Sequence, residues 1–300
     1  MFDKNLIVFL DGEYKKLSET TISPTTHSLH YGTAVFEGIR AYQTEKGTAI
    51  FRLSEHIERL FYSAKVMQMD ITFSLKEVEN ICVEILRKNK LKSAYIRPLV
   101  FYDENSLGIT TKENKTRLLI LAWEWGKYLA NSVTVKISPY RRISEKSTVA
   151  DAKISGHYAN SFLATMDAKK DGFDEALLLD HNEAIAEGPG ENIFFIKEKK
   201  LYTPTNGKIL PGITRDSVLR LAKEDLNYKV REKEIFPEDL DLFEGAFFTG
   251  TAAEITPIEK IQSNAGEFIF DVEKGKDIKE LFFRVVAGRE KSKLKWLTTV

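Results

Sequence analysis

The sequence is poor in cysteine, which limits both the compartment and the chemistry open to the protein. Cys82 is the only cysteine among 300 residues. One thiol cannot form a disulfide framework within the chain or a cysteine-based zinc site, and it fits a reducing compartment. Charge of one sign is not in surplus either, because 44 Lys and Arg residues balance 44 Asp and Glu residues. The sequence therefore gives no indication of a nucleic acid or an anionic lipid as partner.

Long apolar runs are also absent. The first such run covers only residues 6–10 before Asp11-Gly12, which is too short for the core of a signal peptide or for a membrane span. Apolar residues nevertheless make up 43% of the chain and charged residues 29%. A sizeable core can form, and disorder is excluded as the main state. We expect a soluble, cytoplasmic globular protein.

Two common signatures of cofactor sites are missing as well. No G-x-G-x-x-G follows a strand and opens a helix, so a dinucleotide site has no support. Among the five histidines, His27 and His30 lie three residues apart with no third ligand nearby. We therefore assign no metal.

Strand-like runs and helical stretches are mixed along the chain without strict alternation, which favours an α+β fold over a doubly wound parallel sheet. One helix is expected over residues 55–67 with Ser54 as N-cap, and another after a capping box at residues 74–77. Further helices are expected over residues 158–170, from near Thr214, and from about Ile278 to the end of the chain. Strands are expected over residues 6–10, 37–42, 49–53, 94–101, 118–123, 133–137, 175–179, 184–186, 192–196, 201–203 and 246–249.

The hydrophobic pattern changes at residues 125–131, between two strand-like runs. We interpret this segment as an interdomain linker. It predicts a small N-terminal domain over residues 1–124 and a large domain over residues 132–300. We find no internal repeat and no low-complexity tract that would suggest another division.

Two glycine-containing turns are candidates for anion binding. In LPGITRD, residues 210–216, Pro211 and Gly212 turn the chain, and Thr214 stands where a helix N-cap belongs. Free N–H groups and the positive end of the helix dipole make such a junction suitable for phosphate. TGTAAE, residues 249–254, offers a second turn of N–H groups with the hydroxyl of Thr251. Each turn taken alone is more simply explained as an ordinary capped turn.

Three side chains add chemistry to these turns. Lys153 lies among small and apolar residues that would partly desolvate it, as a Schiff-base nucleophile requires. Glu187 begins the glycine-rich bend EGPGEN, where a buried carboxylate could pair with a protonated ring nitrogen. Arg52 could grip a phosphate through two N–H groups. Each has a simpler interpretation as a surface residue, but together with the two turns they are the parts of a pyridoxal-phosphate enzyme.

The motifs around these residues resemble those of the branched-chain amino acid aminotransferases, within the fold-type IV pyridoxal-phosphate family. KISGHYANS, AEGPGENIF, LPGITRDSV and FFTGTAAEITP occur in the order and at the spacing typical of that class. HSLHYGTAVFEGIRAY, with Tyr95-Ile96-Arg97-Pro98, is typical of the branched-chain subgroup. The resemblance implies the two-domain D-amino acid aminotransferase-like fold, with a small α/β N-terminal domain and a larger pseudo-barrel domain that binds pyridoxal 5'-phosphate.

The resemblance also implies roles for single residues. Lys153 would carry the cofactor and shuttle the proton, Tyr158 would bond the phenolic oxygen of the cofactor, and Glu187 would pair with its ring nitrogen. The contacts to the cofactor phosphate would come from Arg52, Ile213, Thr214 and Thr251. Leu210 would pack on the cofactor ring. Tyr95, with the N–H groups of Thr251 and Ala252, would bind the α-carboxylate of the substrate. The walls of the side-chain pocket would come from Tyr31, Phe36, Trp125 and Tyr128. Arg97 would let the same pocket accept the glutamate carboxylate.

The implied reaction is a ping-pong transfer of the amino group of L-leucine, L-isoleucine or L-valine to 2-oxoglutarate, which gives branched-chain 2-oxo acids and L-glutamate. The implied assembly is a homodimer or a dimer-based hexamer, in which residues 103–108 reach the partner's active site. A D-amino acid aminotransferase or an aminodeoxychorismate lyase would keep Lys153 and Glu187, and a non-catalytic scaffold could keep the fold. Tyr95 and Arg97 together with Tyr31 favour the L-branched-chain interpretation, and the intact Lys153 argues against a scaffold.

Overall fold

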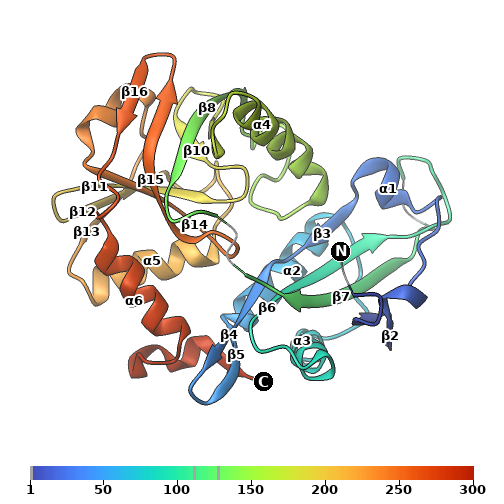
Figure 1. The fold of residues 1–300 in the computed structure, drawn as a ribbon. Helices are drawn as coiled ribbons and strands as arrows, with labels where there is room; N and C mark the ends of the chain where they lie inside the picture. Colours follow the sequence, from blue (N-terminus) through green and yellow to red (C-terminus); the bar gives the residue numbers. More distant parts are fainter. Residues whose placement is uncertain (1–2, 111–112, 127–128) are drawn as a thin grey trace. The chain divides into compact units, whose positions relative to one another are not determined.

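A computed structural model describes residues 3–110, 113–126 and 129–300, and the chain divides into two compact units. Unit 1 consists of Met1–Gly126, Ala152–His157 and Val285–Val300, and unit 2 of Lys127–Asp151 and Tyr158–Arg284. Each unit has its own sheet (Figure 1), and each sheet contributes to a separate hydrophobic core.

The boundaries of the two units differ from those of the predicted domains, because two segments after residue 132 belong to unit 1. Ala152–His157 joins unit 1 through an antiparallel bridge between Val35 and Ile154. Val285–Val300 joins it through the last strand, whose Leu297 pairs with Phe51. These pairings connect positions far apart in the sequence, so a linear reading of the hydrophobic pattern does not detect them.

In the described part of unit 1, an eight-stranded sheet has the order β17-β5-β4-β6-β7-β1-β2, with β3 paired to β6. Neighbouring strands run antiparallel at each of these pairings. The strands are β1 (Ile7–Leu10), β2 (Glu13–Lys16), β3 (Ala34–Phe36), β4 (Ile39–Thr44), β5 (Gly47–Phe51), β6 (Ala94–Tyr102), β7 (Thr116–Glu124) and β17 (Leu297–Thr299). The helices are α1 (His27–Tyr31), α2 (Leu53–Val66) and α3 (Leu75–Asn89).

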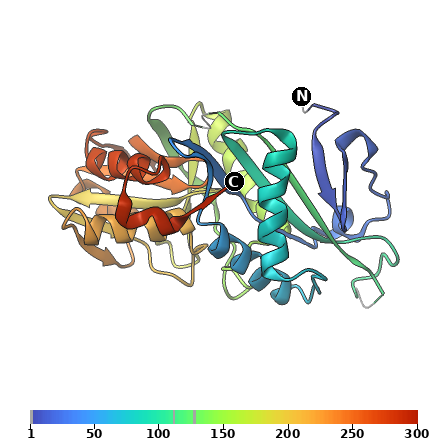
Figure 2. The same cartoon turned by 90° about the horizontal axis from the view of Figure 1, so that it is seen from below.

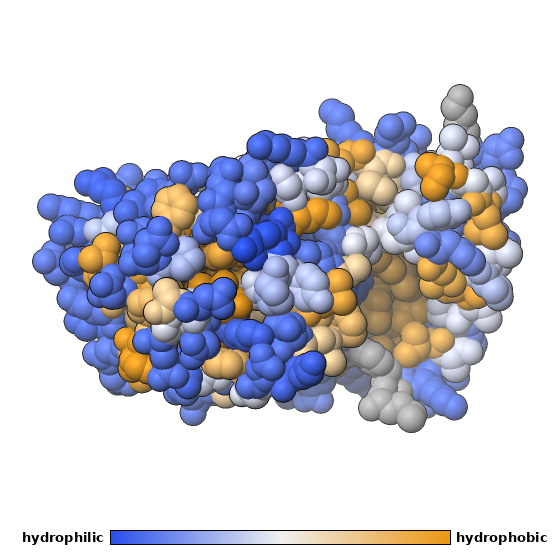
Figure 3. All heavy atoms as spheres, turned by 90° about the horizontal axis from the view of Figure 1, so that it is seen from above, coloured by the Kyte–Doolittle hydropathy of each residue, from blue (hydrophilic) through white to orange (hydrophobic). Residues whose placement is uncertain are grey.

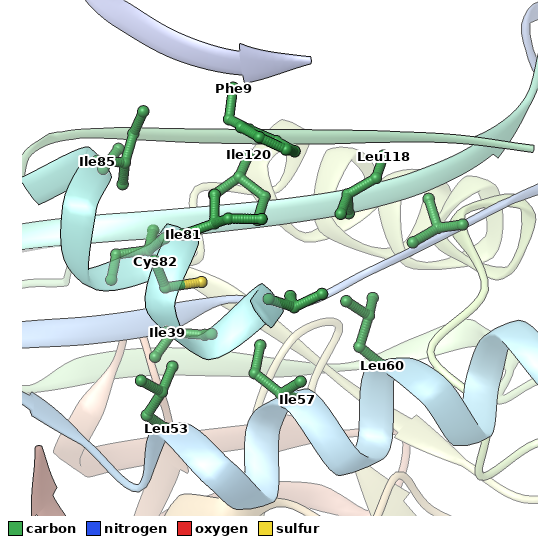
Figure 4. Packing of buried hydrophobic residues seen from close by; sticks show 14 of the residues in the cluster. Phe9, Ile39, Leu53, Ile57, Leu60, Ile81, Cys82, Ile85, Leu118 and Ile120 are labelled. Carbon is green, nitrogen blue, oxygen red and sulfur yellow. The ribbon is translucent and has the colours of Figure 1, made fainter. Parts of the chain in front are cut away.

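The core of unit 1 lies between this sheet and the helices α2 and α3, which cover the same face (Figure 2). Leu53, Ile57 and Leu60 recur on one side of α2 and are fully buried. They meet sheet residues such as Ile39 and Ile120 in one apolar cluster (Figure 4). Burying a side chain of this size contributes about 1.5–3 kcal/mol, so the helical period of these residues explains the position of α2.

The two predicted helix starts in unit 1 have different outcomes. The capping box is confirmed: Ser74 Oγ accepts the Glu77 N–H at 3.3 Å, and Glu77 accepts the Ser74 N–H at 2.7 Å. The N-cap at Ser54 is wrong, because α2 begins at Leu53 and Arg52 caps it in a left-handed conformation with φ 50°. The Arg52 N–H donates to the Trp296 carbonyl at 2.7 Å. A tertiary contact with the end of the chain therefore sets this boundary.

In the described part of unit 2, a nine-stranded sheet closes on itself. Its order is β10-β9-β8-β15-β14-β11-β12-β13, with β16 on β15 and a further pairing between β10 and β11. Because β10 pairs with both β9 and β11, six strands form a closed pseudo-barrel. The strands are β8 (Val133–Arg141), β9 (Glu175–Leu179), β10 (Ile185–Glu187), β11 (Asn192–Lys197), β12 (Lys200–Thr203), β13 (Lys229–Glu232), β14 (Gly245–Gly250), β15 (Glu254–Ser263) and β16 (Gly266–Ile269).

Parallel pairs (β8 with β9, β8 with β15, β12 with β13) occur beside antiparallel ones in this sheet. The α+β class predicted from the sequence is therefore confirmed. The core contains large aromatic side chains, and Phe195 and Phe243 stack with ring centres 4.9 Å apart. The helices of this part of the chain are α4 (Tyr158–Lys170), α5 (Ile213–Glu224) and α6 (Lys276–Val286).

The end of the chain differs from the prediction. The helix expected from about Ile278 to the terminus stops at Val286, and the chain returns as a 3-10 helix (Lys291–Trp296) and strand β17. The long strand β15 was not predicted, because Pro257 interrupts its apolar pattern and proline usually excludes a central strand.

The surface is largely polar on the face drawn in Figure 3, where hydrophilic residues predominate and apolar residues form separate groups. Among the residues that the structure describes, no helix combines the length and the apolar character needed to cross a membrane.

Candidate active site

Lys153 lies in a short connection of unit 1 whose backbone is fixed on both sides. Its N–H donates to Ser63 Oγ at 2.9 Å, and its carbonyl accepts the Phe36 N–H at 3.2 Å. The amine lies 4.9 Å from the centre of the Phe36 ring. The connection is closed by the Gly156 N–H, which donates to the Gly32 carbonyl at 3.1 Å. The predicted lysine is thus partly buried and presented against an aromatic ring.

Four of the predicted substrate residues meet in unit 1. The Arg97 guanidinium lies 4.6 Å from the Phe36 ring centre and donates to the Tyr95 hydroxyl at 3.3 Å. The Tyr95 ring contacts the Trp125 ring with centres 4.8 Å apart. Arg97 Nε is buried without a hydrogen-bond partner among the described residues. This group combines aromatic walls with a cation that has spare donor capacity, and it can take an apolar group or a carboxylate.

Close approach of the backbone to Tyr95 requires glycine at position 38. A Cβ on Gly38 would lie 1.8 Å from the Tyr95 hydroxyl oxygen. The hydroxyl of Tyr31 makes its hydrogen bond outside the Arg97 group. It donates to the Leu107 carbonyl at 2.6 Å. Tyr128 lies outside the described residues.

Arg52 is buried at the start of α2 in unit 1, and three of its interactions are with Glu55 and Trp296. Its Nε donates to the Glu55 carboxylate at 2.7 Å, and its guanidinium lies 5.2 Å from the centre of the Trp296 ring. The third is the backbone hydrogen bond to Trp296 described above. The sequence analysis singled out Arg52 but did not predict that Trp296, in the C-terminal segment, contacts it.

Glu187 is a buried carboxylate in unit 2, 5% exposed, whose two oxygens have separate partners. One oxygen forms an ion pair with the Arg142 guanidinium. The other accepts the Asn192 side-chain N–H at 3.0 Å and the Leu210 N–H at 3.1 Å. A buried carboxylate is costly unless it is paired in this way. These donors give both oxygens of the Glu187 carboxylate a partner.

The bend that carries Leu210 is joined to the same carboxylate. Asn192 donates from one nitrogen to both Glu187 and the Leu210 carbonyl, the latter at 2.9 Å. A Cβ on Gly212 would lie 2.0 Å from Asn192 Oδ1, so only glycine fits at the start of α5. The structure therefore brings Glu187 and the LPGITRD turn together.

Both turns predicted to bind an anion lie in unit 2, but the N-cap of the helix after the first turn differs from the prediction. Gly212 and not Thr214 is the N-cap of α5, and it has no side chain to cap the helix. Ile213 and Thr214 occupy the first turn and are buried, which fits the positive end of the helix dipole. The second turn joins β14 to β15, with Thr251 and Ala252 half-buried at its tip. Beside it, the Thr249 hydroxyl is buried with no partner among the described residues.

Sequence reasoning missed the residues that support these groups. Arg142 lies 45 residues before Glu187 in the sequence, so no local pattern connects them. Asn192 stands inside the quoted motif AEGPGENIF, and a polar residue at the start of a buried strand is a signal that could have found it. A buried group around Glu37 in unit 1 was also missed. Among the described residues, no cluster of three or more His, Cys, Asp or Glu residues could hold a metal ion.

The chain is similar to known proteins along its whole length. The family model for amino-transferase class IV matches residues 34–261. The chain belongs to this family. A curated branched-chain-amino-acid aminotransferase from Pseudomonas aeruginosa is 41% identical, over 100% of this chain and 99% of the relative.

Solved structures of branched-chain aminotransferases are also similar to this aminotransferase. A crystal structure of the T.th. branched-chain amino acid aminotransferase with pyridoxamine 5'-phosphate has 39% identity and a TM-score of 0.94, and each chain covers 99% of the other. The same protein complexed with N-(5'-phosphopyridoxyl)-L-glutamate has 39% identity, a TM-score of 0.91 and 99% coverage of each chain. The resemblance to branched-chain aminotransferases, the fold-type IV architecture and the assignment as a transaminase are confirmed.

Proposed function

We propose that the protein uses pyridoxal 5'-phosphate to transfer the amino group of L-leucine, L-isoleucine or L-valine to 2-oxoglutarate in a ping-pong reaction. The observation that carries this proposal is the buried Glu187 carboxylate, which is paired with Arg142, Asn192 and the Leu210 N–H. Such a group fits a protonated ring nitrogen. When bound, the cofactor supplies an aldehyde that joins to amines and a ring that accepts electrons.

The residues of this chain fit that cofactor by their chemistry. Glu187 would hold the ring-nitrogen proton at its carboxylate, and Leu210 would pack on the ring. Ile213 and Thr214 lie in the first turn of α5, where backbone N–H groups have no partner within the helix. With Arg52 and Thr251 they would bind the phosphate. Tyr158, the first residue of α4, would donate to the phenolic oxygen.

Lys153 would act in proton transfer. We assign its Nζ as the group that carries the cofactor at rest and, once released, takes the proton from the substrate α-carbon and returns it later. The hydrogen bonds to Ser63 and Phe36 would orient its side chain for this task. General acid–base catalysis of this kind contributes roughly 10²–10⁴-fold to the rate.

The substrate pocket would be built by Phe36, Tyr95 and Trp125 around Arg97. Their aromatic rings favour a branched apolar side chain, and the unpartnered Nε of Arg97 favours a carboxylate in the second half-reaction. Tyr31 and Tyr128 would complete the pocket, and Tyr95 with Thr251 and Ala252 would bind the α-carboxylate. This set explains how one pocket serves both leucine and glutamate.

The assembly and the location are part of the proposal. We infer a homodimer or a dimer-based hexamer, supported by Phe162, Leu163 and Met166 on α4, which are 63%, 47% and 51% exposed. Apolar groups of this size in one place are typical of contact surfaces. A cytoplasmic location fits the single thiol.

The experiment that tests the reaction follows 4-methyl-2-oxopentanoate after purified protein is mixed with L-leucine, 2-oxoglutarate and pyridoxal 5'-phosphate. We expect product with the wild type and none with Lys153→Ala. Borohydride reduction followed by peptide mapping should place the cofactor on Lys153. Turnover of D-alanine or aminodeoxychorismate instead of leucine would overturn the assignment.

A further inference from the structure

Arg215 is the positively charged residue of the LPGITRD turn, and the proposed function gives it no role. Its side chain is 3% exposed and lies in the first turn of α5. A terminal nitrogen of the guanidinium donates to the Pro204 carbonyl at 2.8 Å and to the Glu232 carboxylate at 2.6 Å. All three residues belong to unit 2.

The two acceptors of Arg215 mark the ends of two neighbouring strands. Pro204 follows directly after β12, and Glu232 is the last residue of β13. The two strands run parallel, with Thr203 opposite Glu232, so their carboxyl ends lie at one edge of the sheet. One guanidinium therefore connects the first turn of α5 to both strand ends.

The position of Arg215 is unfavourable for a cation. The N-terminus of a helix carries a partial positive charge, which disfavours Lys and Arg in the first turn. The Arg215 Nε is also buried with no hydrogen-bond partner among the described residues, and an unsatisfied buried donor is destabilising. An apolar side chain would avoid both effects, but it could not make the two directional contacts to the strand ends.

Apolar packing holds the rest of α5 to unit 2. Val218, Leu221 and Ala222 lie further along the helix and are fully buried, and the helix contacts β13 and β14 (Figure 1). Hydrophobic contacts are not directional, so they keep the helix on the sheet without fixing the exact place of its first turn. The hydrogen bonds of Arg215 add that constraint at the end where the turn opens.

The turn before the helix has an anchor of its own. The Asn192 side chain, at the start of β11, donates to the Leu210 carbonyl at 2.9 Å. The chain is thus tied to β11 before the helix begins, and to β12 and β13 through Arg215 in the first turn. Ile213 and Thr214 lie between these two anchors, which together determine the position of their backbone.

We propose that Arg215 is a positioning residue for the phosphate site, and that it holds the N–H groups of Ile213 and Thr214 where a phosphate monoester binds. The inference rests on the proposed function, in which these two residues bind the phosphate of pyridoxal 5'-phosphate. Arg215 acts through the backbone of the turn, because its own donor is used by the two strand ends. Its loss weakens binding of the phosphate group and leaves binding of the pyridine ring unchanged.

The first test compares pyridoxal 5'-phosphate with pyridoxal, which has the same ring and aldehyde but no phosphate. Each compound is titrated into cofactor-free protein, and its dissociation constant is measured from the visible absorbance band. The variants are Arg215→Met and, as a matched control, Arg220→Met. Arg220 lies on the same helix, but its side chain is 48% exposed and pairs with Asp216.

We expect Arg215→Met to bind pyridoxal 5'-phosphate at least about tenfold more weakly than the wild type, with the affinity for pyridoxal within about twofold. A tenfold change corresponds to about 1.4 kcal/mol, which is the size of one hydrogen bond. Arg220→Met should match the wild type with both compounds. A residue with a purely structural role would not separate the two compounds in this way.

The outcomes distinguish the inference from the proposed function. If the wild type shows no band, or binds pyridoxal as tightly as pyridoxal 5'-phosphate, the proposed phosphate site fails and the inference with it. If the wild type prefers the phosphate and Arg215→Met keeps this preference, the inference alone is overturned. Equal weakening toward both compounds in Arg215→Met, or loss of the preference in Arg220→Met, would also overturn the inference alone.

A second pair of variants covers the case in which Arg215→Met does not fold. Glu232→Ala removes one acceptor of Arg215, at a side chain that is 42% exposed. Glu234→Ala is the control, because Glu234 is 50% exposed and pairs with Lys208 instead. We expect the preference for pyridoxal 5'-phosphate over pyridoxal to fall about threefold in Glu232→Ala and to stay unchanged in Glu234→Ala. The same preference in both variants would overturn the proposal.

Discussion

At the scale of single residues, neighbouring arginines on β8 and just after it face different surroundings. Arg142 pairs with Glu187, and the two side chains are 11% and 7% exposed. Arg141 pairs with Glu183, and these side chains are 38% and 60% exposed. Buried pairs leave an uncompensated charge when one partner is removed, whereas exposed pairs are replaced by water. The two positions therefore form a matched experiment.

We predict that Arg142→Met lowers the free energy of unfolding by about 3–5 kcal/mol, because the buried Glu187 carboxylate would lose its ion-pair partner. Arg141→Met should leave the free energy of unfolding almost unchanged. Urea denaturation followed by circular dichroism measures both. Equal losses in the two variants would contradict the assignment of Arg142 as the buried ion-pair partner of Glu187.

The residue scale also shows what the sequence could and could not reveal about the site. Lys153 and Glu187 can be proposed as site residues because the motifs around them are local and specific. Arg142 and the buried group around Glu37 are not found, because their partners are fixed by strand and helix packing between distant positions. A buried ion pair has no local signature.

At the scale of elements, two glycines at helix ends differ in what surrounds them. Gly32 caps α1 with φ 65°, and a Cβ there would lie 2.8 Å from the Gly156 Cα. Gly172 follows α4 with φ 83°, and a Cβ there would meet nothing within 4 Å. Both positions favour glycine through their backbone conformation. Gly32 in addition lies directly against the connection that carries Lys153.

We predict that Gly32→Ala and Gly172→Ala share a loss of stability of about 1–2 kcal/mol from the left-handed backbone. Gly32→Ala should also displace the connection at Gly156 and slow the reaction of Lys153 with pyridoxal 5'-phosphate. Gly172→Ala should react at the wild-type rate. Thermal unfolding and the visible absorbance band measure the two effects. A normal rate in Gly32→Ala would show that the backbone contact between the glycines does not position Lys153.

Elements with a strong local signal could be predicted well from the sequence. The helix over residues 158–170 and the strand over residues 175–179 have the predicted bounds. The start of α2 could not, because the Trp296 carbonyl determines it from the far end of the chain. Strand β15 is central in its sheet but contains Pro257, and only its pairing with β8 and β14 makes it a strand. Tertiary pairing overrides local preference at both positions.

At the scale of the whole molecule, the chain passes between the two units four times, at residues 126–127, 151–152, 157–158 and 284–285. The last passage brings β17 to the sheet of unit 1, where Leu297, Thr298 and Thr299 pair with β5. Trp296 is buried beside it and contacts Arg52. Residues 296–299 therefore stabilise β5 and Arg52 in the N-terminal part of unit 1.

We predict that deletion of residues 296–300 destabilises the protein by at least about 3 kcal/mol, the cost of losing one buried tryptophan. This loss corresponds to a fall of roughly 6–12 °C in the midpoint of thermal unfolding. Leu294→Ala, at a position 38% exposed, should leave the midpoint nearly unchanged. Binding of pyridoxal 5'-phosphate should weaken in the truncated chain, because Arg52 loses its support. An unchanged midpoint after truncation would contradict the role of β17.

The pairing of β17 with β5 has a consequence for biosynthesis. While the ribosome is still translating, β5 has an open edge with unpaired backbone groups, even though most of its sheet has emerged. Such an edge invites pairing with other chains. The sheet is completed only after residues 297–299 leave the exit tunnel, so a stop codon before residue 297 would release a chain prone to aggregation.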